Sequence, residues 1–158
     1  MFKLILYKLI RLFFSNVIVY IFLIRTKKGQ MKMNKWQEEW AYNKYWVMAH
    51  SQQCYEQIRL LAKDNEWSEQ KNIEFKNLLE KAASQTPTVK TLTNAYQHVW
   101  GYFKKICTAE EKQTYLHLLQ ELSPTEDKLG PFLSRLAEKY QVSYLLNSRL
   151  IQENKEKL

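Results

Sequence analysis

The segment Asn94–Lys105, N-A-Y-Q-H-V-W-G-Y-F-K-K, carries the pattern that decides the fold. On a helix at about 100° per residue, its apolar and polar residues separate onto opposite sides. The packing side holds Ala95, Val99, Phe103 and Ile106. The polar side holds Asn94, His98, Gly101 and Lys105, flanked by Gln97, Tyr102 and Lys104. The segment therefore predicts an amphipathic helix, which ends near Cys107 where a capping-box pattern, Thr108 to Glu111, begins the next helix.

The predicted polar side lacks carboxylates and instead combines an amide, an imidazole, a phenol and two ammonium groups. Gly101 in the middle of this helix would cost about 1 kcal/mol relative to alanine, and it leaves room for a close approach. Two interpretations follow. Either another helix crosses at Gly101 beside a hydrogen-bonded core histidine, or this side of the helix binds a ligand.

The remaining segments also have helical periodicity, and none alternates with a period of two. A long first helix is expected over residues 34–63, with apolar stripes on two sides that include Trp36 and Leu60. Caps and breakers then place helices at about 68–83, from Thr88 or Thr91 to 107, 109–122, 130–140 and 143–152, with fraying from Glu153. The sequence therefore predicts an all-α, compact bundle of five to six helices.

The net charge of +8 is concentrated at one end of the chain. Residues 1–33 contain seven Lys and Arg residues and no acid, whereas residues 34–158 contain 17 basic and 16 acidic residues. The body is therefore not globally basic, and any anion binding must depend on local clusters.

Residues 1–33 differ from the rest of the chain and form an apolar, basic N-terminal extension to a single domain at 34–158. We expect this extension to form a separate apolar helix outside the bundle. The uninterrupted apolar run, residues 12–24, is shorter than the roughly 20 residues of a membrane span, so we expect no stable insertion. We expect a cytoplasmic protein whose natural chain starts at Met31 or Met33. The alternative is an N-terminal membrane anchor through residues 12–24.

A second set of polar residues beside aromatic ones lies on the predicted first helix. Lys44, Met48, Ser51 and Tyr55 follow one another at steps of four, three and four, and His50 adjoins Ser51. A lysine whose stem covers the core explains this pattern as well as a binding site does.

Metal and catalytic sites find little support in the sequence. His50 and Cys54 have the spacing of two zinc ligands, but no other candidate ligand converges on them. His98 is the one candidate base, and no Asp or Glu shares its stripe to orient it. We therefore expect no metal, no cofactor and no catalytic residue.

The combined pattern resembles the YbgA-like bacterial proteins, a domain of unknown function. It is carried by Lys44, Met48 to Ser51, Tyr55, Pro87-Thr88, Asn94, His98, Gly101 to Lys104, Lys112, Pro131, Tyr140 and Tyr144-Leu145. Similar modules follow an iron–sulfur desulfidase domain that acts on thiolated uridine, where they are implicated in holding tRNA. This chain has no such desulfidase domain, and its last residues depart from the family pattern.

The resemblance and the residues together favour a non-catalytic module that binds structured RNA, with tRNA as the expected partner. The expected binding residues are Lys44, His50, Ser51, Tyr55, Asn94, His98, Gly101, Tyr102, Lys104 and Lys105. Lysines would contact phosphates, Tyr102 would stack, and Asn94 and His98 would donate hydrogen bonds. The alternatives are a small-molecule site or enzyme that uses His98, and a bundle that docks a partner such as a separately encoded desulfidase.

Overall fold

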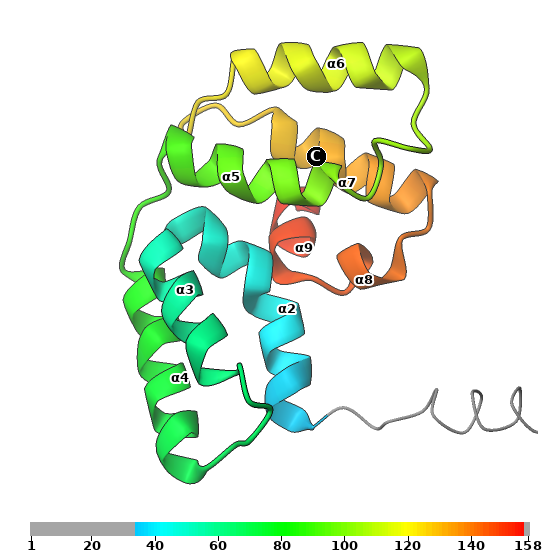
Figure 1. Ribbon diagram of the computed structural model, residues 1–158. Coiled ribbons are helices and arrows are strands. Elements are labelled where there is room, and N and C mark those ends of the chain that lie inside the picture. Colours follow the sequence, from blue (N-terminus) through cyan, green and yellow to red (C-terminus); the bar gives the residue numbers. More distant parts are fainter. Residues whose placement is uncertain (1–33, 157–158) are drawn as a thin grey trace, which may run out of the picture. The chain divides into compact units, whose positions relative to one another are not determined.

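The computed structural model describes residues 34–156, which contain eight α-helices and no strand (Figure 1). In chain order these are α2 (Lys35–His50), α3 (Gln52–Leu61), α4 (Glu69–Ala83), α5 (Val89–Trp100), α6 (Ala109–Gln120), α7 (Leu129–Lys139), α8 (Ser143–Leu146) and α9 (Arg149–Lys155). The predicted all-α class is confirmed. The expected N-terminal helix, the anchor at residues 12–24 and the alternative start sites lie outside the described residues.

The prediction of one long helix over residues 34–63 is wrong, because the helix is interrupted at Ser51. This residue has an extended backbone (φ −151°, ψ 109°), and its Oγ accepts a hydrogen bond from the Cys54 N–H at 3.3 Å. Ser51 is thus the N-cap of a new helix, α3, which lies beside α4 (Figure 1). Because the break resets the helical phase, the stripe predicted to include Leu60 does not exist as one face, and Leu60 is 68 % exposed.

The central helix α5 begins where the sequence indicates and ends earlier. Thr88 is its N-cap and forms a capping box with Thr91. The helix ends at Trp100, not near Cys107, and Gly101 is its C-cap. Residues 101–107 form successive turns, in which the Phe103 N–H donates to the Trp100 carbonyl at 2.9 Å. Gly101 therefore begins a turn and does not lie in the middle of a helix.

The C-terminal segment also differs from the expected single helix at 143–152. It divides into α8 and α9 at Asn147 and Ser148, and the buried Ser148 hydroxyl donates to the Leu145 carbonyl at 2.7 Å. The expected fraying from Glu153 is wrong, because α9 continues to Lys155 and Asn154 is only 1 % exposed. These two breaks, at 51 and at 147–148, turn six expected helices into eight.

The core lies where α2 packs against α5 and α9, with α7 against both α5 and α9 (Figure 1). The aromatic and aliphatic side chains at its centre are Tyr96, Phe75, Phe103, Met48, Ile58, Leu129, Leu133, Leu145, Ile151, Val47 and Val99. Met48, expected at the edge of the main apolar stripe of the first helix, is fully buried.

A polar network inside this core links α5, α7 and α9. The Tyr96 hydroxyl donates to the Asp127 carboxylate and accepts a hydrogen bond from Asn154 Nδ2 at 3.2 Å. The other carboxylate oxygen of Asp127 accepts from the backbone N–H groups of Leu129 and Gly130, both at 3.0 Å, and so caps the start of α7. Burial, followed by the neighbouring Asp127 charge, raises the pKa of Tyr96.

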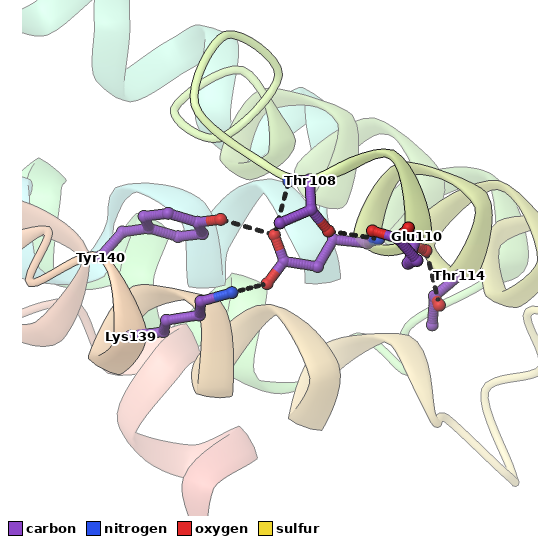
Figure 2. Close-up of polar contacts among 6 residues, drawn as sticks. Thr108, Glu110, Thr114, Lys139 and Tyr140 are labelled. Atoms are coloured by element: carbon purple, nitrogen blue, oxygen red, sulfur yellow. Dashed lines mark hydrogen bonds and ion pairs between the residues drawn. The ribbon is translucent and has the colours of Figure 1, made fainter.

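Helix α6 is connected to α7 by the carboxylate of Glu111. Figure 2 shows the side chains of Lys139 and Tyr140 extending toward the start of α6 at Thr108. Lys139 Nζ donates to Glu111 Oε1 at 2.6 Å, and the Tyr140 hydroxyl donates to Oε2 at 2.5 Å. The Thr108 N–H also donates to Oε2, at 2.8 Å, which confirms the predicted capping box. These contacts, Lys139 first, lower the pKa of Glu111 to about 2. The carboxylate therefore fixes the end of the 101–107 turn segment.

Two features are absent from residues 34–156. No helix in this range is both long and apolar enough to cross a membrane. In the same range, no group of three or more His, Cys, Asp or Glu side chains is arranged to hold a metal ion.

Candidate functional site

Three tyrosines from distant parts of the chain form one cluster, here called the tyrosine cluster: Tyr45 of α2, Tyr102 after α5 and Tyr144 of α8. The Tyr45 ring stands at 88° to each of the other two, with centroid distances of 6.4 Å to Tyr102 and 6.1 Å to Tyr144. Tyr102 and Tyr144 are nearly parallel, with an angle of 13° and centroids 6.0 Å apart. The hydroxyls of Tyr45 and Tyr102 are hydrogen-bonded at 3.1 Å.

One tyrosine of the cluster is buried and the other two are exposed. Tyr45 is 5 % exposed, whereas Tyr102 is 39 % and Tyr144 is 38 % exposed. Burial, and then the hydrogen bond with Tyr102, raises the pKa of Tyr45. Burial also raises the pKa of Tyr144, and the nearby Tyr102 and Tyr55 add to this effect. The cluster therefore presents two aromatic rings, Tyr102 and Tyr144, to solvent above the buried ring of Tyr45.

One lysine lies over a ring of the cluster, and two more follow Tyr102 in the chain. Lys44 Nζ lies 5.6 Å from the centroid of the Tyr45 ring, within the range of a cation–π contact. Lys104 and Lys105 are exposed and follow Tyr102 in the same turn. Among residues 34–156, no carboxylate forms an ion pair with any of these three lysines. Their charges are therefore available to an anionic ligand.

His98 and Gly101 lie on the surface, so the core-packing interpretation of these residues is wrong. Both are exposed, and a Cβ added at Gly101 would meet only its own helix, with the His98 carbonyl oxygen at 3.0 Å. No helix crosses there. Within the described residues, His98 makes no hydrogen bond or ion pair with a carboxylate.

Of the other predicted residues, Tyr55 is buried in α3 beside the tyrosine cluster, whereas Ser51, Asn94 and His50 make contacts with residues outside it. Ser51 caps α3, and Asn94 Nδ2 donates to Gln52 Oε1 at 2.6 Å, so these two residues join α3 to its neighbours. His50 stacks on Trp46 with centroids 3.9 Å apart and has its Nδ1 2.8 Å from the Trp46 carbonyl oxygen.

His50 also lines a small cavity of about 130 Å³, together with Ala49, Pro87, Leu92, Tyr96, Pro124, Asp127, Leu150, Glu153 and Asn154. The Tyr96–Asp127–Asn154 network forms part of its wall, and none of the clustered tyrosines lines it. This cavity is therefore distinct from the tyrosine cluster.

Sequence reasoning did not place Tyr45 and Tyr144 among the site residues. Tyr45 and Tyr102 are 57 positions apart, and Tyr144 comes from a four-residue helix. In the sequence, only the family resemblance pointed to Tyr144. The residues around Tyr45 do not distinguish it from an aromatic residue of the core.

The chain was compared with known families, curated proteins and solved structures. The model of the family described as "Protein of unknown function (DUF1722)" matches residues 44–154, which include the tyrosine cluster and its lysines. No curated protein and no solved structure matches the chain significantly. Because the family model covers more than half of the sequence, the chain belongs to the DUF1722 family of proteins of unknown function.

Proposed function

We propose that this protein is a non-catalytic helical module that binds structured RNA at the tyrosine cluster and the lysines around it. The observation that carries the proposal is the combination of two exposed, nearly parallel tyrosine rings with three lysines that have no carboxylate partner among residues 34–156. RNA offers both matching groups, since bases stack on aromatic rings and phosphates attract ammonium groups.

The charge distribution favours binding of modest affinity. The 34–158 segment carries almost equal numbers of basic and acidic residues, so attraction to RNA comes from the few lysines near the cluster. A small number of phosphate contacts gives a weak dependence on salt, because each contact releases only its own share of counterions.

The resemblance supports tRNA as the RNA. We assign the chain to the YbgA-like group within DUF1722 on the residues quoted above, and such modules accompany a thiouridine desulfidase domain. A separately encoded desulfidase is then the expected protein partner, and both partners place the protein in the cytoplasm. His98 donates to the RNA in this proposal; its exposure and its lack of a carboxylate partner among residues 34–156 disfavour a role as a catalytic base.

An electrophoretic shift of bulk tRNA with the full chain in low salt tests the proposal. We expect retardation at micromolar protein, and no shift at tens of micromolar would refute RNA binding. The double variant Lys104→Ala/Lys105→Ala should weaken binding and reduce the slope of log K against log salt by about 0.7–0.9 for each lysine–phosphate pair that it removes.

Two controls distinguish binding at the tyrosine cluster from general electrostatic attraction between basic residues and RNA. Lys63 and Lys81 are exposed and, within residues 34–156, form no ion pair, so the variant Lys63→Ala/Lys81→Ala removes the same charge outside the cluster and should leave binding nearly unchanged. A chain that starts at Met33 lacks the seven basic residues of the N-terminal extension. The Lys104/Lys105 effect should persist in it.

A further inference from the structure

We propose that the tyrosine cluster binds an unstacked base, so that the RNA it selects carries an unpaired loop or bulge instead of an uninterrupted duplex. This inference rests on the proposed function and names the class of RNA. It follows from the orientation and the exposure of the rings, and from the small number of lysines around them.

The exposed tyrosine rings offer a surface for base stacking, but the bases of an intact duplex cannot stack on it. In A-form RNA each base is covered by its neighbours on both faces, and the helix presents only edges, riboses and phosphates. An aromatic side chain gains stacking energy only from a base that has left the helical stack. Tyr102 and Tyr144, each more than one-third exposed, would gain nothing from an intact duplex.

The spacing of the rings shows how a base would lie. A base sandwiched between two rings needs about 7 Å between their centroids, since each stacking contact takes about 3.5 Å. The Tyr102 and Tyr144 centroids are 6.0 Å apart, so the base stacks on an outer face and not between them. The buried Tyr45 ring packs at an interplanar angle of 88° against both rings, and its hydroxyl is hydrogen-bonded to the Tyr102 hydroxyl. The platform is therefore preorganised for one base.

The lysines are too few to define a duplex-binding surface. Recognition of double-stranded RNA uses contacts to riboses and phosphates along more than one groove, which requires an extended basic surface. Here Lys44 lies over the Tyr45 ring, Lys104 and Lys105 follow Tyr102 in the chain, and residues 34–158 are nearly neutral overall. Such a site fits the phosphates that flank one unstacked nucleotide.

The test compares two labelled RNAs with the same number of nucleotides, a hairpin with an unpaired loop and a blunt duplex without unpaired bases. Both are titrated with the full chain by fluorescence anisotropy at one salt concentration. We expect the hairpin to bind about 5- to 150-fold more tightly, the range given by stacking of one base. Equal affinities for the two RNAs would overturn the inference and leave the proposed function standing. Failure to bind either RNA would refute both.

Variants at Tyr144 assign the preference to the cluster. Tyr144→Ala should abolish the preference for the hairpin and leave duplex binding unchanged, whereas Tyr144→Phe keeps the ring and should preserve it. A reduced affinity for both RNAs with Tyr144→Ala would contradict the stacking role.

A second measurement needs no variant. A 2-aminopurine placed in the hairpin loop should lose fluorescence when the wild-type chain binds, because stacking on tyrosine quenches it. The same analogue in the stem should not respond. A loop signal that stays constant at saturating protein would overturn the inference.

Discussion

Replacing Gly130 with alanine tests the packing of the core network directly. Gly130 lies in the first turn of α7, and a Cβ at this position would lie 2.5 Å from the Tyr96 hydroxyl and 2.5 Å from Asn154 Nδ2. Real Cβ contacts are essentially never this short. Tyr96 and Asn154 are each 1 % exposed and line the cavity of about 130 Å³, so either side chain can move toward that cavity only by leaving its place in the network. The methyl group must therefore force the network apart.

The expected cost combines three terms. Overpacking in a filled core costs about 1–3 kcal/mol. Breaking the 3.2 Å hydrogen bond between Asn154 and Tyr96 costs about 1 kcal/mol more. Replacing glycine recovers about 0.4–1 kcal/mol by restricting the unfolded chain. We expect Gly130→Ala to lower the free energy of unfolding by about 1–3.5 kcal/mol.

Urea unfolding followed by circular dichroism measures this difference, and Gly101→Ala is the matched control. Gly101 is exposed with φ −51°, which alanine adopts freely, and its added Cβ would meet only the His98 carbonyl at 3.0 Å. The same gain of about 0.4–1 kcal/mol from replacing glycine is opposed here only by this close contact, so we expect the control to stay within about 1 kcal/mol of wild type. A Gly130→Ala variant as stable as the control would refute the packing argument.

Three further changes probe other contacts, each by urea unfolding. Tyr96→Phe removes a hydrogen bond to the Asp127 carboxylate and should cost about 2 kcal/mol; a cost under about 0.5 kcal/mol would contradict the network. Glu111→Gln should cost about 1 kcal/mol at pH 7, after allowing for solvent screening. Because folding lowers the pKa of Glu111 from 4.5 to about 2, its contribution is complete above pH 4.5 and is lost as the pH falls toward 2, so variant and wild type should converge there. Ser51→Ala removes the N-cap of α3 and should cost about 1 kcal/mol, whereas unchanged stability would indicate that the break has another cause.

The sequence predicted the elements that depend on local chemistry. The N-caps Ser68, Thr88 and Thr108 begin α4, α5 and α6 as expected, because each hydroxyl accepts a hydrogen bond from a backbone N–H only three residues away. Periodicity also indicated the all-α class correctly, since every apolar run repeats with the helical period.

The helix breaks were missed because periodicity is a poor guide to where a helix stops. Apolar residues continue across Ser51 at helical spacing, and only the serine itself, with its capping bond to Cys54, interrupts them. Ser148 ends one short helix and precedes another in the same way, with its hydroxyl buried against the Leu145 carbonyl. At both positions the serine could have indicated the start of a new helix, but the apolar periodicity was given more weight in the prediction.

The candidate site was only partly predictable, because its parts meet through the tertiary fold. The polar stripe of Asn94–Lys105 identified Tyr102 and the two lysines, which are adjacent in sequence. Tyr45 and Tyr144 reach Tyr102 only after α2 and α8 pack beside the turn segment. Conversely, His50 and Ser51 are close in sequence to Lys44, yet the end of α2 directs them to other contacts.

The central claim, that RNA binds at the tyrosine cluster, is tested most directly by nuclear magnetic resonance. Isotope-labelled full chain would be titrated with hairpin RNA while backbone and tyrosine ring signals are followed. We expect the largest shifts at Tyr102, Lys104, Lys105 and Tyr144, smaller ones at Lys44, and none in α4. Shifts confined to residues 1–33, or centred on α4, would contradict the account.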